Sequence, residues 1–164
     1  MTARSTQGFI QLGPVAIPCR IGRSGRRHLK REGDGATPVG TWTLIGCLYR
    51  ADRLRRPRTA LPLRTLAAED GWCDATTDRN YNRPVRLPYP ASHEEMWRTD
   101  GLYDIVVVLS HNRRPRLRGA GSAVFFHLTG QPPAATAGCI SVSRRDMLRI
   151  LEVCGPGTRL RVWS

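Results

Sequence analysis

The chain has 164 residues, a length typical of one domain that can bury a sizeable core, and we expect a single domain over residues 1–164. It carries 26 Lys and Arg against 13 Asp and Glu, a net charge of +13 that favours an acidic partner. No apolar run approaches the ~18 residues of a membrane-spanning helix, so a transmembrane segment is not expected.

Three kinds of acidic partner fit this charge: nucleic acid, an anionic membrane, and an acidic polymer such as cell-wall peptidoglycan. The basic run Arg53–Arg58 contains Pro and has no neighbouring aromatic residue to stack on bases, so nucleic acid is not expected. The segment Met1–Arg20 has only a short, interrupted apolar stretch and no clear signal-peptide core. The sequence therefore predicts either a protein that stays inside the cell or one whose leader lies outside this chain.

The cysteines and histidines show neither a CxxC pair nor the spacing of a metal site. Their scatter favours reduced thiols over a disulfide framework, and no metal or organic cofactor is expected. The five cysteines are Cys19, Cys47, Cys73, Cys139 and Cys154, and the four histidines are His28, His93, His111 and His127.

The first third of the chain alternates short apolar stretches with glycine-rich ones. Gly8–Gly22 predicts one or two short strands. Gly22–Gly40 is dense in glycine and charge, which predicts a surface loop without regular structure. Thr41–Ile45, with β-branched and aromatic residues, predicts a strand.

Residues 49–90 are rich in Pro and turn-forming residues. A long irregular segment inside a small domain usually caps a site, so we expect an insertion that folds over a cleft. Trp72 and Tyr81 would either form flat apolar walls of that cleft or be buried for stability.

Two helices and three strands are predicted in the second half. Ser92–Trp97 and Ser143–Cys154 each begin with a capping-box pattern and predict helices. Tyr103–Ser110 has a continuous apolar run that predicts a strand buried on both faces. Ala123–His127 and Thr158–Trp163 predict two more strands, so the chain is expected to be mainly β.

His127, at a strand end, and Cys139, after a loop of small residues, form the candidate catalytic pair. A thiol attacks only as the thiolate, and an imidazole within reach can take its proton and return it to a leaving group. Gly138 lets a substrate approach closely, and the amides of Gly138 and Cys139 would face an oxyanion. The alternative is a buried core Cys with a structural His. His111, at the end of another strand, is a rival base.

Three segments carry a resemblance to a known family. HLTGQPPAATAGCIS, His127–Ser141, resembles the signature of the L,D-transpeptidase catalytic domain, the YkuD-like family: a His, a spacer and a Gly-Cys pair. GDGATPVGTWTL, Gly33–Leu44, and IVVVLSHN, Ile105–Asn112, are similar to two further family segments and follow in the expected order. Ala137 stands where many members have a second His, and Ser141 where many have an Arg, which indicates a compact, divergent branch.

The resemblance implies a curved sheet or β-sandwich with one or two short helices, Cys139 as nucleophile and His127 as base. It implies a monomeric acyltransferase of the cell envelope that acts on peptidoglycan stem peptides without a cofactor, in cell-wall cross-linking or remodelling. A cysteine peptidase or amidase, or a non-catalytic module that binds an anionic polymer, stays an alternative. Further substrate contacts are expected from His111, Asn112, Thr136, Ala137, Asp34 and Arg31.

Overall fold

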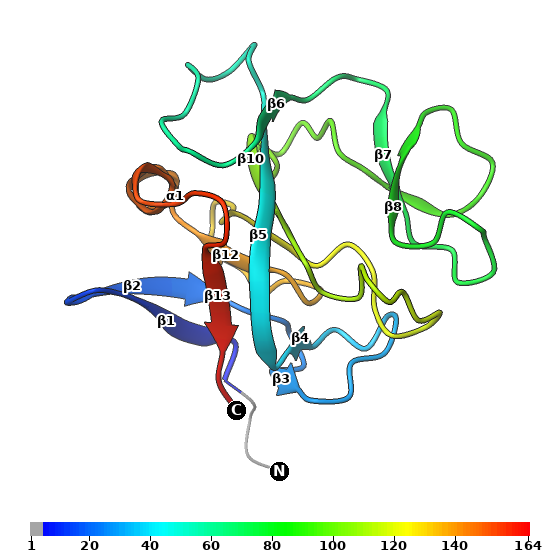
Figure 1. Cartoon of the computed structure of the whole chain (residues 1–164), viewed down its shortest axis with the longest axis horizontal. Coiled ribbons are helices and arrows are strands. Elements are labelled where there is room, and N and C mark those ends of the chain that lie inside the picture. The colour runs from blue at the N-terminus through cyan, green and yellow to red at the C-terminus, as the bar shows by residue number, and fades with distance from the viewer. Residues whose placement is uncertain (1–4) are drawn as a thin grey trace.

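A mixed eight-stranded sheet forms the centre of the computed structural model, which describes residues 5–164 (Figure 1). Its strand order is β1-β2-β12-β11-β10-β5-β13, and β6 pairs with β5 beside that path. The bounds are β1 Gln7–Leu12, β2 Val15–Arg20, β5 Gly40–Tyr49, β6 Leu63–Thr65, β10 Ile105–Leu109, β11 Phe125–Leu128, β12 Ile140–Val142 and β13 Arg159–Val162. The prediction of a mainly β chain is confirmed.

The middle of this sheet is buried on both faces. Every residue of β10 is buried, because alternate side chains enter two separate apolar clusters. Val107 packs into one cluster with Phe126, and Val106 packs into the other with Phe125. The strand predicted over Tyr103–Ser110 is therefore confirmed, as is its burial on both sides.

The single helix of residues 5–164, α1 (Arg144–Glu152), lies against this sheet. The backbone N–H of Asp146 donates to the Ser143 hydroxyl over 3.1 Å, which confirms the predicted cap. Met147 and Leu151 on its inner side are buried in the core, and Cys154 just beyond it is buried as expected. No helix of the described residues has the length and apolarity that crossing a bilayer requires.

A second, three-stranded sheet, at the right of Figure 1, contains β7 (Asp70–Cys73), β8 (Arg83–Arg86) and β9 (His93–Glu95). The helix predicted at Ser92–Trp97 is therefore wrong. β9 pairs antiparallel with β7 and places Glu94 opposite Trp72. A six-residue helix gains too few hydrogen bonds to compete with such strand pairing.

Residues 49–90 are more ordered than the sequence predicts, because they contain β6, β7 and β8. Trp72 and Tyr81 are both buried, which confirms the alternative of burial for stability. Neither residue forms an exposed wall of a cleft. The Trp72 indole N–H donates to Asn82 Oδ1 over 2.9 Å. Of this segment only Asp74 lines the cavity that contains Cys139.

The Gly22–Gly40 segment also holds more regular structure than expected. Two short parallel strands, β3 (Arg26–Arg27) and β4 (Thr37–Pro38), pair within it. Thr37, in β4, is fully buried, and its hydroxyl accepts the Gly22 N–H over 2.8 Å. The segment is therefore a fixed part of the fold.

Candidate active site

The register of two parallel strands brings His127 and Cys139 to one face of the sheet. β11 and β12 pair so that Phe126 lies beside Ile140 and His127 beside Ser141. Because strand side chains alternate, Phe126 and Ile140 enter the core on one face, and His127 and Ser141 lie on the other. Cys139 precedes Ile140, so it lies on the His127 face, and both residues line the same cavity.

This cavity has a volume of about 530 Å³ and a wall of mixed charge. Its cationic lining residues are Arg23, Lys30 and Arg98, and its acidic ones are Glu32, Asp74, Glu94 and Asp100. Thr136 and Ala137, predicted as substrate contacts, also line it. Such a lining suits a ligand that carries both an ammonium and a carboxylate group.

His127 is held in one orientation by a backbone carbonyl. Its Nδ1 lies 2.8 Å from the Leu128 carbonyl oxygen, which can only accept, so in the neutral ring Nδ1 carries the proton and Nε2 carries the lone pair. The ring also makes an edge contact with Tyr103, with centroids 5.1 Å apart. Burial lowers the pKa of His127 to about 4, so the imidazole is neutral at neutral pH and can accept a proton.

Cys139 is buried, with 8% of the residue exposed, and its thiol contacts two backbone groups. Its Sγ donates to the Ala123 carbonyl oxygen over 3.2 Å and accepts the Phe125 N–H over 3.3 Å. Burial, with the Glu94 carboxylate, raises the pKa of Cys139 to about 12, although the Phe125 N–H opposes the shift. The resting site therefore holds a neutral thiol and a neutral imidazole.

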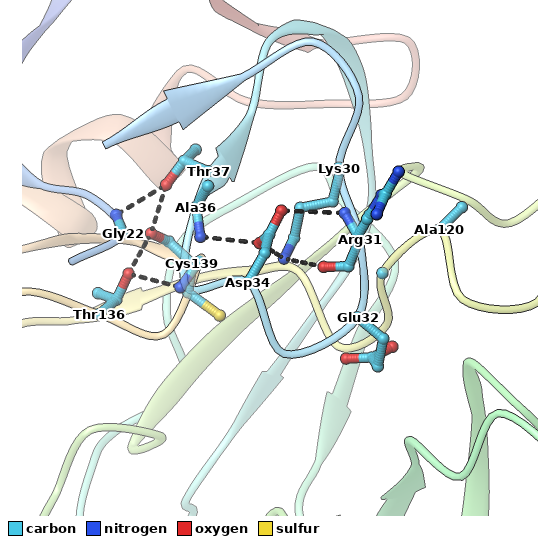
Figure 2. Close-up of polar contacts among 12 residues, drawn as sticks. Gly22, Lys30, Arg31, Glu32, Asp34, Ala36, Thr37, Ala120, Thr136 and Cys139 are labelled. Atoms are coloured by element: carbon cyan, nitrogen blue, oxygen red, sulfur yellow. Dashed lines mark hydrogen bonds and ion pairs between the residues drawn. The ribbon is translucent and has the colours of Figure 1, made fainter. Parts of the chain in front are cut away.

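The turn before Cys139 is fixed by two threonine hydroxyls (Figure 2). Thr136 and Thr37 donate to the Cys139 carbonyl oxygen over 2.6 and 3.3 Å. The Gly138 N–H donates to the Thr136 hydroxyl over 3.1 Å, so an oxyanion would compete with that hydroxyl for the amide. Gly138 has a φ of 140°, and a Cβ there would lie 2.9 Å from the Ala36 carbonyl oxygen.

Asp34 and Arg31, expected to contact substrate, lie beside the cavity and do not line it. Asp34 accepts from the Lys30 ammonium, from Arg31 N–H over 3.0 Å and from Ala36 N–H over 2.9 Å. Burial opposes ionisation of Asp34, but these hydrogen bonds outweigh it and lower its pKa. The Arg31 side chain is exposed. The role that the structure gives Asp34 is to hold Lys30 and its own turn.

His111 and Asn112 also lie outside the cavity lining. His111 Nε2 is 3.0 Å from the Ala120 carbonyl oxygen, and its ring packs edge-on against Trp42 at 4.8 Å between centroids. Asn112 donates to the Gly121 carbonyl oxygen over 2.8 Å. Both side chains organise the loop that precedes β11, and the structure does not bring the rival base to Cys139.

Most charged residues of the cavity were not predicted from the sequence, and among the missed residues are Lys30, Glu94, Arg98 and Tyr103. The Tyr103 hydroxyl donates to the Glu94 carboxylate, and Arg98 lies over the Tyr103 ring at 5.1 Å. Two signals were available. Lys30 is the only lysine in an arginine-rich chain. In addition, a strand at residues 93–95 places the Glu94 side chain on the opposite face from His93 and Glu95, so a strand prediction would have set Glu94 apart from its neighbours.

The fold and the site define a mainly β protein with a Cys–His pair in a charged cavity. Comparison with protein families agrees: the family described as the L,D-transpeptidase catalytic domain, YkuD, matches residues 11–162. The chain therefore belongs to the YkuD family. Members are L,D-transpeptidase enzymes that act on peptidoglycan and are usually associated with the cell envelope. No curated protein and no solved structure matches the chain.

Proposed function

We propose that this chain is an L,D-transpeptidase-like acyltransferase that acts on peptidoglycan stem peptides in the cell envelope through a thioester at Cys139. One observation carries the proposal. In a member of this family, a thiol and a neutral imidazole protonated at Nδ1 line one cavity, at positions fixed by the β11–β12 register.

The reaction begins when Nε2 of His127 takes the Cys139 proton and the sulfur attacks the carbonyl carbon of the third residue of the stem. The C–S bond forms, and the carbonyl electrons move to oxygen, which the Cys139 amide faces. Collapse of this intermediate breaks the C–N bond, and His127 gives its proton to the departing D-amino acid. An acceptor amine then attacks the thioester, loses its proton to His127 and releases the thiol.

The neutral resting pair sets a condition on the first step. Because the thiol donates its hydrogen bond to the Ala123 carbonyl oxygen, the S–H bond of Cys139 must rotate away from this acceptor before Nε2 of His127 can take the proton. With pKa values of about 12 and about 4, a preformed thiolate–imidazolium pair is strongly disfavoured. Proton transfer therefore accompanies attack on the bound donor.

The mixed charge of the cavity fits a stem peptide, which carries carboxylates and, in many forms, a free ammonium. Arg23, which lines the cavity and is exposed, would bind a carboxylate. Glu94 and Asp74 would receive the ammonium. The net charge of +13 also draws the protein to an anionic polymer.

A carbapenem, which mimics the acyl donor, tests the nucleophile. Intact mass should show one covalent adduct on the wild type, and peptide mapping should place it at Cys139. Cys139→Ala should give none, and Cys73→Ala, which removes a fully buried thiol in β7, should react like the wild type. An adduct that persists in Cys139→Ala would show that another residue is the nucleophile.

Product analysis with a disaccharide-tetrapeptide then defines the reaction. A cross-linked dimer together with a free D-amino acid would identify transpeptidation. Release of the D-amino acid with a free tripeptide as the only other product would identify hydrolysis. Salt-dependent binding without any thioester would mean that the domain recognises an anionic polymer without catalysis.

A further inference from the structure

Lys30 is the single lysine of the chain, and its side chain is buried in the wall of the Cys139 cavity. The side chain is only 5% exposed. Its ammonium donates to the Asp34 carboxylate and, over 2.9 Å, to the Arg31 carbonyl oxygen (Figure 2). An ammonium has three N–H donors, so one remains without a hydrogen-bond partner among residues 5–164.

Two glycines make room for this side chain. A Cβ on Gly121 would lie 2.8 Å from Lys30 Cγ and 3.2 Å from its Cε, and a Cβ on Gly138 would lie 3.6 Å from Cε. Both glycines have positive φ values, 91° and 140°. The unbranched stem of Lys30 thus runs past both glycines, and Gly138 is the residue directly before the nucleophile.

The residues next to Cys139 in the sequence bring no positive charge to it. They are Ala137, Gly138, Ile140 and Ser141. The amide of Gly138 is already engaged by the Thr136 hydroxyl. Any cation that stabilises a developing negative charge at this position must therefore come from another part of the fold.

Three charged side chains act on the Cys139 thiol from other elements. Glu94, on β9, raises its pKa, whereas Lys30 and Arg98 lower it. Arg98 is committed elsewhere, because it forms a 2.5 Å ion pair with Asp100 and lies over the Tyr103 ring. Lys30 is the cation that both adjoins Gly138 and keeps an unused donor.

We propose that Lys30 stabilises the negative charge that forms on the Cys139 sulfur and on the substrate oxyanion during acyl transfer. The second half of this inference rests on the proposed function; the first half concerns the thiol alone. Asp34 and the Arg31 carbonyl fix the ammonium beside the turn. A lysine suits the position, because a compact charge on a thin stem fits past two glycines where a planar guanidinium is wider.

Alkylation by iodoacetamide, a neutral reagent, tests the inference without any peptidoglycan substrate. Modification of Cys139 is followed by peptide mass mapping between pH 7 and 9.5. Lys30→Met should react about tenfold more slowly than the wild type at every pH, since loss of a nearby cation raises a thiol pKa by about one unit. Lys30→Arg should recover part of the rate. Arg27→Met, an equal loss of charge on exposed β3, should react like the wild type.

A second variant controls for loss of folding stability, because Lys30→Met leaves the buried Asp34 carboxylate without its cation. Lys30→Met/Asp34→Asn removes both charges and should show the same slow alkylation in a chain whose folding is verified by circular dichroism. An alkylation profile equal to that of the wild type in either folded variant would overturn the inference. Slower acylation only by donors with a free carboxylate, with alkylation unchanged, would also overturn it and make Lys30 a substrate-binding residue.

The proposed function can fail separately. If the wild type forms no acyl-enzyme with any donor but Lys30→Met still alkylates about tenfold more slowly, Lys30 stabilises the thiolate and the acyltransferase assignment is wrong. If acyl-enzyme forms and alkylation does not depend on Lys30, the acyltransferase assignment holds and the role proposed for Lys30 is wrong.

Discussion

The backbone N–H of Phe125 donates to the sulfur of Cys139 over 3.3 Å, and the thiol proton in turn points to the carbonyl of Ala123, two residues earlier. Ala123 has a φ of 48°, a conformation that costs free energy in a residue with a side chain. The chain just before β11 is thus shaped to hold the sulfur. In this arrangement the Cys139 thiol is stored in protonated form, and in the proposed reaction the imidazole would remove the proton when a donor arrives.

Two pH profiles should therefore differ in the same enzyme. Alkylation of Cys139 should rise about tenfold per pH unit from pH 7 to 10 without a plateau, because burial raises the thiol pKa to about 12. Acylation by a carbapenem should instead rise as His127 loses its proton near pH 4 and stay level above pH 6. A plateau of alkylation below pH 8 would mean that the resting thiol is ionised.

Replacing His127 by Gln should separate chemistry from thiol reactivity. Acylation by the carbapenem should fall by about 10²- to 10⁴-fold, the usual contribution of a general base. Alkylation by iodoacetamide at pH 9 should change less than about threefold, since His127 makes no hydrogen bond to the sulfur in the resting site. Equal losses in both reactions would indicate that the variant has lost the shape of the site.

The stability of the fold should also depend on His127. Its pKa is lowered to about 4 in the folded chain and is about 6.5 unfolded, so between these values the unfolded chain binds the extra proton. The free energy of unfolding should therefore fall by about 3 kcal/mol as pH drops from 7 to 4, on account of this residue. Urea unfolding at both pH values measures it, and His127→Gln should show a smaller decrease.

Gly138→Ala should destabilise the turn before Cys139. The new Cβ would meet the Ala36 carbonyl oxygen at 2.9 Å, on a backbone with a φ of 140°. We expect a loss of about 2 to 3 kcal/mol in the free energy of unfolding and a large fall in acylation. Gly119→Ala is a matched control, because that glycine also has a positive φ but has open space around it. Equal destabilisation by both substitutions would assign the effect to φ alone.

Asp104 joins two distant parts of the chain by ion pairs. This carboxylate is 3% exposed and accepts from Arg53 and Arg144, each over 2.9 Å. Asp104→Ala should cost about 2 kcal/mol of unfolding free energy, below the full value of a buried pair because both arginines reach solvent. Urea unfolding would measure it. A cost no larger than that of Asp52→Ala, which removes an exposed carboxylate paired with Arg50, would show that burial of the Asp104 carboxylate adds nothing.

The sequence predicted those elements whose patterns arise from burial along one strand or helix. The run at Ile105–Leu109 and the cap at Ser143 are local signals, and both are confirmed. The strand His93–Glu95 was missed because it is stabilised by pairing with β7, which no local pattern records. Short polar strands depend on partners that lie far away in the sequence.

The site shows the same division between local and long-range information. Gly138-Cys139 and His127 stand in one recognisable stretch, and the structure brings both side chains to one cavity. The Leu128 carbonyl that orients the imidazole is visible only in three dimensions. Lys30 reaches the cavity wall from more than a hundred residues away, and that approach depends on the paths of two loops.

The parallel pairing of β11 with β12 has an implication for how such enzymes diversify. Since ladder register sets the spacing between His127 and Cys139, residues 130–135 can change in length or composition while the distance between the two side chains stays the same. Natural variation there, or a grafted loop, would alter the choice of donor or acceptor and leave the underlying chemistry intact. The crossover between these strands is therefore a natural place to redirect this scaffold toward new substrates.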